Sequence, residues 1–156
     1  MKIQNLYTIV YTTNFTNMSV RFENQESLER EHKAVLLFCC IYDYTFEKLG
    51  DHDIDFKIFK DEKLVCYLEV KGRNKTIAEA YPLPIAIRKL HNLADKRTKG
   101  VILWDCLDGL IYADYTKLEG TIKVGGRRIP RKGAPNDIEL MAYYNKCEHL
   151  HEYKFK

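Results

Sequence analysis

The stretch DIDFKIFKDEKLVCYLEVKGR, residues 53–73, places an apolar run directly before charged residues. The run from Leu64 to Leu68 is typical of a strand buried on both faces, yet Glu69 and Lys71 follow it at once. Charged side chains at the end of such a strand lose hydration, which is costly unless they are paired or bind a metal. The stretch therefore predicts a site at the end of a buried strand where the charges of Glu69 and Lys71 are paired or bind a metal.

A hairpin is predicted within the same stretch. Residues 55–59 and 64–71 read as strands, a polar turn at residues 60–63 joins them, and Gly72 ends the second strand. Residues two apart on a strand share a face, so Glu69 and Lys71 point the same way, and Asp55 on the neighbouring strand can lie alongside them. Asp53 lies on the same strand face as Asp55 and is an alternative partner.

This set of residue types suits metal-assisted chemistry on phosphate. Two carboxylates with a backbone carbonyl and waters fit Mg²⁺, a hard cation that prefers oxygen ligands and keeps several waters. A lysine beside that metal can help to position and deprotonate a water for attack on phosphorus. The alternative is structural: Glu69 and Lys71 pair with each other, or with Asp55, at a solvated end of the sheet.

An amphipathic helix is predicted before the hairpin. Asn24 is its expected N-cap, and it runs to about Ile41. Its apolar arc holds Leu28, Val35, Phe38, Cys39 and Tyr42. Because Glu31 lies inside this arc, we expect the helix to supply a second charge that faces the core.

The other predicted elements complete an α/β fold with a mixed central β-sheet flanked by helices. They are a strand at residues 6–15, a helical turn at 76–81, a helix from Pro84 to about Lys96, strands at 101–105, 110–115 and 121–124, and a closing helix from Asn136. On the helix from Pro84, the side chains expected to face inward are Ile87, Leu90, Leu93 and Ala94. With no repeat or linker, residues 1–156 are expected to form one domain.

Charge is segregated along the chain although the net charge is only +3. Basic residues concentrate in residues 71–99 and 123–132, and acidic residues in 23–31 and 43–61. This pattern indicates a surface facing a polyanion beside an acidic pocket, and its alternative is a solvated surface with clustered signs.

The compartment is expected to be the cytoplasm. The first residues lack the apolar core of a signal peptide, and no apolar stretch is long enough to span a membrane. The five cysteines are odd in number, and Cys39, Cys40 and Cys66 lie in apolar runs, where they read as buried and reduced.

The motif DIDF…CYLEVKGR, preceded by a helix carrying EHKA, resembles the PD-(D/E)XK nuclease superfamily over about residues 31–112. The resemblance implies a restriction-endonuclease-like αβββαβ core and phosphodiester hydrolysis with Mg²⁺ or Mn²⁺. By position it implies that Asp55, Glu69 and the Val70 carbonyl bind the metal. It likewise implies that Lys71 activates water and that Glu31 is an accessory catalytic acid. Asp53 stays an alternative ligand, although spacing to Glu69 and the following Phe56 favour Asp55.

Nucleic-acid contacts are expected from basic residues around this site. Many superfamily members carry a polar residue on the helix after the lysine strand, and the resemblance implies Lys89 there, with Arg88 as its rival. Glycines let main-chain amides approach phosphates, and arginines bind phosphates bidentately. Residues expected to contact phosphate on this ground are Arg73, Arg127, Arg128, Arg131 and Lys132, and the alternative for the loop at 125–135 is a solvated hairpin tip.

The leading hypothesis is a metal-dependent nuclease that acts on DNA, as an endonuclease or an exonuclease, with structure-specific or low sequence specificity. Phage or mobile-element DNA processing fits this hypothesis, and cutting both strands with one site per chain favours a homodimer. The alternatives are a non-catalytic nucleic-acid-binding or protein-interaction module on the same fold, and an RNA-directed nuclease.

Overall fold

The computed structural model describes residues 25–50, 53–126 and 138–156. Its elements are α2 (Gln25–Tyr42), β1 (Thr45–Lys48), β2 (Phe56–Lys60), β3 (Lys63–Gly72), the 3₁₀ turn η1 (Ile77–Glu79), β4 (Leu83–Ala86), α3 (Ile87–Asp95), β5 (Gly100–Asp105), β6 (Gly109–Asp114), the 3₁₀ turn η2 (Tyr115–Lys117), β7 (Gly120–Gly126), β8 (Ile138–Tyr144) and β9 (His151–Lys154). The predicted α/β class is confirmed. The strand predicted at residues 6–15 lies outside the described residues.

The main sheet is mixed and six-stranded, with the order β1-β2-β3-β5-β6-β9. The β3–β5 pair is parallel, and the other neighbours are antiparallel. A second sheet has the order β4-β8-β7. The run α2-β1-β2-β3-α3-β5, with β4 inserted before α3, matches the αβββαβ core expected of a restriction-endonuclease-like fold.

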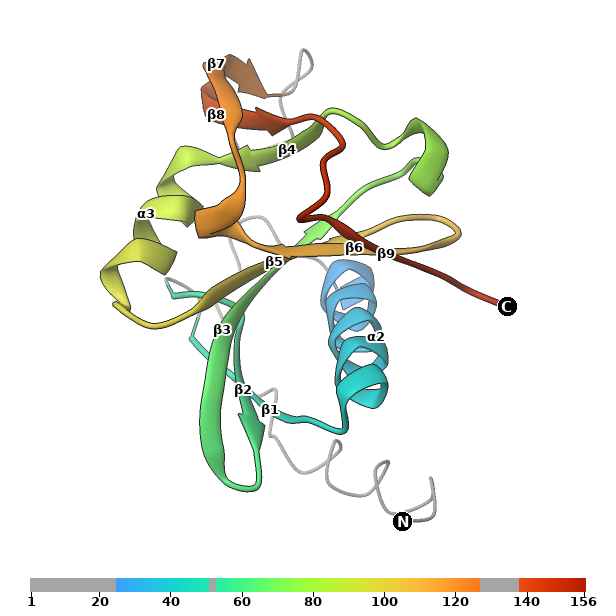
Figure 1. Cartoon of the computed structure of the whole chain (residues 1–156), viewed down its shortest axis with the longest axis vertical. Coiled ribbons are helices and arrows are strands. Elements are labelled where there is room, and N and C mark those ends of the chain that lie inside the picture. The colour runs from blue at the N-terminus through green and yellow to red at the C-terminus, as the bar shows by residue number, and fades with distance from the viewer. Residues whose placement is uncertain (1–24, 51–52, 127–137) are drawn as a thin grey trace.

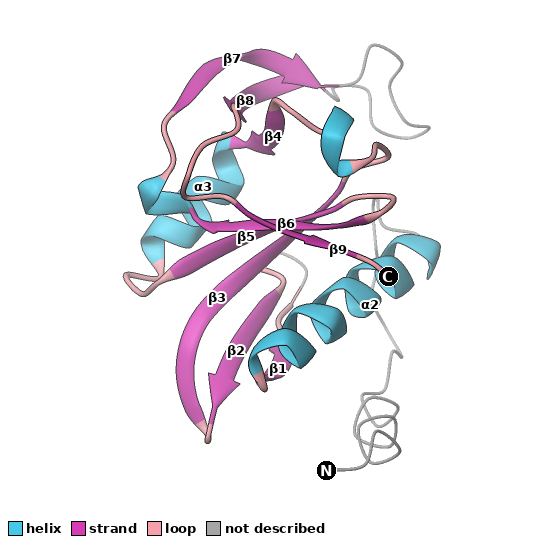
Figure 2. Cartoon of the chain, turned by 45° about the vertical axis from the view of Figure 1, so that its right-hand side comes forward, coloured by secondary structure: helices cyan, strands magenta, loops and turns pink. Residues whose placement is uncertain are grey.

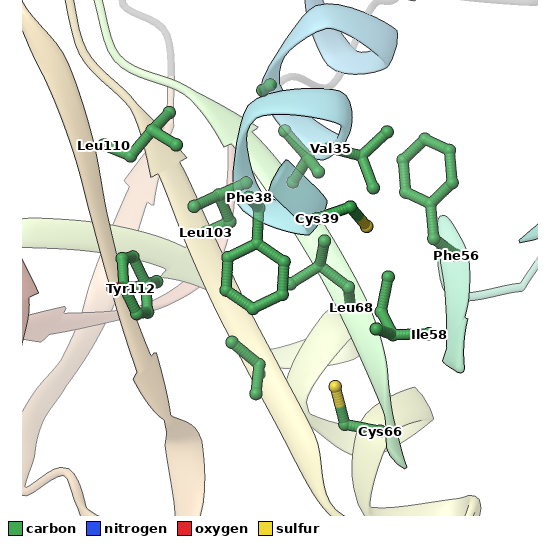
Figure 3. Packing of buried hydrophobic residues seen from close by; sticks show 13 residues of the cluster. Val35, Phe38, Cys39, Phe56, Ile58, Cys66, Leu68, Leu103, Leu110 and Tyr112 are labelled. Carbon is green, nitrogen blue, oxygen red and sulfur yellow. The ribbon is translucent and has the colours of Figure 1, made fainter. Parts of the chain in front are cut away.

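The main sheet lies between two layers (Figures 1 and 2). On one face α2 packs its apolar stripe onto β2, β3, β5 and β6, with Val35 and Phe38 against Leu68 and Leu103 (Figure 3). On the other face α3 and the three-stranded sheet cover the buried Trp104. Side chains alternate along β3, so Cys66, Leu68 and Val70 face α2, whereas Tyr67 packs on the α3 side.

The predicted β2–β3 hairpin is present, and a two-residue turn joins its strands. Asp61 and Glu62 form the turn with φ angles of 48° and 64°, between the paired residues Lys60 and Lys63. Positive φ at both central positions is the geometry that matches the right-handed twist of the flanking strands. The hairpin brings the start of β2 beside the end of β3.

The helix predicted from Pro84 begins three residues later, at Ile87, because Pro84 belongs to strand β4. β4 is an edge strand, where proline is tolerated since it costs no ladder hydrogen bond on the outer side. The Pro84 carbonyl points away from the ladder and accepts a hydrogen bond from Trp104 Nε1 at 2.8 Å. The prediction that Ala94 faces inward was also wrong, since Ala94 is exposed at the end of α3.

The closing helix predicted from Asn136 was wrong. Residues 138–144 form β8, the middle strand of the small sheet, paired with both β4 and β7. Pairing on both sides satisfies its backbone and overrides the capping signal in the sequence. A smaller correction concerns Cys40, which is exposed, whereas Cys39 and Cys66 are buried as expected.

Neither helix among the described residues is both long and apolar enough to cross a membrane.

Candidate active site

A cleft of about 400 Å³ opens where β3 ends and β2 begins. It is lined by side chains from α2, β3 and α3, by the residue before β2, and by β7 and β8 of the small sheet. Seven of the candidate site residues singled out from the sequence line it: Glu31, Asp55, Glu69, Val70, Lys71, Arg88 and Lys89. The fold thus gathers the predicted charged residues at one place.

The hairpin register sets Asp55 against Glu69. Phe56 pairs with Leu68, so the next step of the same antiparallel ladder places Asp55 opposite Glu69. Phe56 and Leu68 both face α2, and their neighbours therefore face the opposite side, toward α3. The sequence-based expectation that Asp55 lies alongside Glu69 agrees with this geometry.

The backbone of Val70 also faces Asp55. Its amide donates a hydrogen bond to Asp55 Oδ2 at 2.8 Å. The amide and carbonyl of one strand residue point to the same side, so the Val70 carbonyl is directed toward the Asp55 side and away from β5. A carbonyl in this position can complete a set of oxygen ligands with the two carboxylates.

Asp53, the alternative ligand, is engaged elsewhere. Its carboxylate oxygens lie 2.6 and 2.8 Å from Lys96 Nζ, and it accepts a hydrogen bond from the Ile54 amide. The hydrogen bond from Lys96 holds the pKa of Asp53 below its usual value. Asp53 is not among the cleft residues, whereas Asp55 is.

Glu69 is the most buried charge in the site, with 3% of its surface exposed. Burial, together with the negative charge of Asp55, raises the pKa of Glu69 to about 8. Its Oε2 atom is buried and has no hydrogen-bond partner among the described residues. Unpartnered buried carboxylate oxygens are costly, so this atom is suited to bind a cation.

Lys89 compensates the other oxygen of Glu69. Its Nζ lies 2.6 Å from Glu69 Oε1. Burial lowers the pKa of Lys89, but Glu69 and Asp55 raise it by more, so the amine stays charged. The first turn of α3 therefore supplies a cation to the site, at the position the resemblance implied. The alternative interpretation of the sequence was an ion pair at a solvated end of the sheet, and the burial of Glu69 contradicts a solvated position.

Lys48, on β1, is a site residue that sequence reasoning missed. Its Nζ lies 3.1 Å from Glu31 Oε2 and 3.7 Å from Asp55 Oδ1. β1 is four residues long, reads TFEK and carries no recognisable motif. Glu31 lines the cleft from α2 and contacts this lysine.

Lys71 projects from the exposed end of β3 into the cleft, on the same strand face as Glu69. It is thus solvent-accessible, while Glu69 two residues earlier is buried. This arrangement lets one strand present a buried carboxylate and, next to it, an amine that reaches water and substrate.

The remaining basic residues divide into three groups. Arg73 donates through Nε and Nη2 to the Ala80 carbonyl at 3.0 and 2.8 Å, so its guanidinium holds a loop in place, and its phosphate contact stays a prediction. Arg88 lines the cleft and pairs with Glu139 at 2.9 Å. The predicted contacts Arg127, Arg128, Arg131 and Lys132 lie outside the described residues.

A second missed pair stiffens the floor of the cleft. Arg30 donates from Nε to Asp105 Oδ2 at 2.6 Å and from Nη2 to the Asp105 carbonyl at 2.7 Å. This two-point contact ties the first turns of α2 to the end of β5. Asp105 is buried, and Arg30 neutralises its charge.

The donor set fits a hard divalent cation. Within the described part of the chain, no three His, Cys, Asp or Glu side chains converge on a metal position. The site instead offers the carboxylates of Asp55 and Glu69 and the Val70 carbonyl. Mg²⁺ typically takes one or two carboxylates and completes its shell with waters and substrate phosphate, so a fuller cage is not required.

A comparison with protein families agrees with this geometry. A family model described as "Phage putative PDDEXK endonuclease" matches residues 18–149. No curated protein and no solved structure matches the chain.

Proposed function

The chain belongs to this phage PDDEXK endonuclease family, and on that premise we propose that it is a nuclease that hydrolyses phosphodiester bonds of DNA with Mg²⁺ or Mn²⁺. The observation that carries the proposal is Glu69: a buried carboxylate facing Asp55, with one oxygen unpartnered among the described residues.

We assign the metal site to Asp55, Glu69 and the Val70 carbonyl. When bound, the divalent ion supplies positive charge to the phosphoryl oxygens and lowers the pKa of a bound water. Asp55 is held in place by the Val70 amide, and Glu69 is held by Lys89. The chain therefore fixes both carboxylates before any ligand arrives, which limits the reorganisation needed on binding.

Lys71 is the proposed water-positioning residue. Its amine reaches the cleft from the strand that carries Glu69, so it can hydrogen-bond to a water beside the metal position and to the scissile phosphate. Arg88, which lines the cleft, is a proposed phosphate contact. Gly126, which directly precedes Arg127 in the sequence, also lines the cleft, so the loop at 127–132 is a further proposed contact.

The test is a cleavage assay on supercoiled, branched and single-stranded DNA and on RNA, with Mg²⁺, Mn²⁺ or EDTA. Metal-dependent cleavage of DNA is expected, and Lys71→Ala is expected to slow it by about 10²–10⁴-fold while DNA binding persists. Lys75→Ala is the matched control, because Lys75 is exposed nearby but does not line the cleft.

Three results would contradict parts of this proposal. Cleavage of RNA alone would overturn the substrate, and cleavage in EDTA would overturn the metal. Salt-sensitive binding without cleavage of any substrate would favour a non-catalytic nucleic-acid-binding module.

A further inference from the structure

The ammonium of Lys48 lies between two carboxylates of the cleft. It is 3.1 Å from Glu31 Oε2 and 3.7 Å from Asp55 Oδ1. The first distance is a hydrogen bond, and the second is a charge contact beyond hydrogen-bond distance. Lys48 therefore neutralises Glu31 directly and leaves Asp55 Oδ1 available to another cation.

The position of this ammonium is fixed by the fold. Lys48 pairs with Phe56 across the β1–β2 ladder, and its Nζ lies 4.7 Å from the centroid of the Phe56 ring. Cation–π contact and strand pairing together hold the amine beside Phe56, whose side chain faces α2. Its side chain is 27% exposed, so water screens it only in part.

Lys48 and Glu69 contact different helices, on opposite faces of the main sheet. Lys48 and Glu31 approach from the α2 face, whereas Glu69 and Lys89 belong to the α3 face. A divalent ion between Asp55 and Glu69 would thus meet two carboxylates. An ion between Asp55 and Glu31 would have to displace an ammonium that is already paired there.

We propose that the Lys48 ammonium supplies the positive charge that a second metal ion would otherwise supply, so that the cleft binds one divalent ion. In this arrangement Glu31 is a positioning residue for Lys48 and not a metal ligand. The inference rests on the proposed function and deepens it, because it sets how many metal ions the same site uses.

The consequence for mutation is specific. Replacing the ammonium with an uncharged side chain leaves Glu31 and Asp55 facing each other without a cation, which is an oxygen-rich vacancy of the kind that hard divalent ions fill. Lys48→Met should therefore create a second ion site in place of abolishing the first. Glu31→Gln should leave one site, because Glu31 does not contact the first ion.

The experiment titrates the full chain with Mn²⁺ and measures the number of bound ions in two ways: by calorimetry and by the electron paramagnetic resonance signal of free Mn²⁺. The wild type is expected to bind one ion, and Lys48→Met and Lys48→Gln two. Lys96→Met is the matched control, because Lys96 forms a similar ion pair with Asp53 outside the cleft; it should bind one ion. Two Lys48 variants guard against one that fails to fold, which circular dichroism detects.

The outcomes separate the inference from the proposed function. Two ions bound by the wild type, or one bound by both Lys48 variants, would overturn the inference and leave the nuclease proposal intact. A wild type that binds no Mn²⁺, alone or with DNA, would overturn both. One ion in the wild type and the control, with two in the Lys48 variants, would establish it.

Discussion

Glu69 should make the metal-free protein less stable as the pH rises. Its pKa is raised from 4.5 to about 8 by burial, followed by the charge of Asp55. A carboxyl with a raised folded-state pKa binds its proton more tightly in the folded state, so its contribution to stability is complete below pH 4.5 and is lost as the pH rises through 8.

The size of this effect follows from the same values. At about 1.4 kcal/mol for each tenfold change in proton affinity, the rise from 4.5 to about 8 corresponds to at most about 5 kcal/mol of unfolding free energy. A metal ion bound to the carboxylate should reverse the loss, because it replaces the proton as the compensating charge.

The assay is urea unfolding at pH 5, 6, 7, 8 and 9, in EDTA and again with Mn²⁺. We expect the wild type in EDTA to lose several kcal/mol between pH 5 and 9, and Glu69→Gln to lose clearly less. Mn²⁺ should flatten the wild-type profile and leave Glu69→Gln unchanged. Equal pH slopes for the two proteins in EDTA would refute the assigned burial of the Glu69 charge.

Three further predictions concern neighbouring cations. Lys89→Met should destabilise the metal-free protein by about 3 kcal/mol at pH 9, because it leaves the ionised, buried Glu69 unpaired. At pH 5, where Glu69 is protonated, the loss of stability should be smaller. Equal losses at both pH values in urea unfolding would contradict the ion pair. The pKa of His32 is lowered mainly by burial and, to a smaller extent, by the positive charge of Lys48. Lys48→Met should therefore raise the pKa of His32 in an NMR titration. An unchanged pKa would mean that the Lys48 ammonium lies farther from His32 than the structure shows. Arg73→Ala should lower the unfolding free energy by about 1–3 kcal/mol, because both hydrogen bonds to the Ala80 carbonyl are lost. Unchanged stability together with weaker DNA binding would instead show that Arg73 contacts phosphate.

The hairpin and its charges could be predicted because they depend on local patterns. Strand alternation fixes that Glu69 and Lys71 share a face, and a two-residue turn fixes the register that brings Asp55 opposite Glu69. The helix carrying Glu31 was predictable from its apolar arc. These features need few contacts from distant parts of the chain.

The missed features depend on distant contacts. Pro84 resembles a helix start, but pairing with β8 and the hydrogen bond from Trp104 make it part of a strand. Residues 138–144 have no strong local strand signal and become β8 by pairing on both sides. Lys48 belongs to a four-residue strand, and its role depends on Glu31, 17 residues earlier. No spacing rule in the sequence connects the two.

The most direct test of the central claim, that Asp55 and Glu69 together hold a divalent ion, compares the Mn²⁺ affinity of Asp55→Asn with that of Asp53→Asn. Loss of a ligand should weaken binding by at least about 100-fold in Asp55→Asn, since losing an outer-shell partner alone typically costs 10–100-fold. Asp53→Asn should bind as the wild type does, because Asp53 pairs with Lys96 outside the cleft. Wild-type affinity in Asp55→Asn, or a loss confined to Asp53→Asn, would contradict the account.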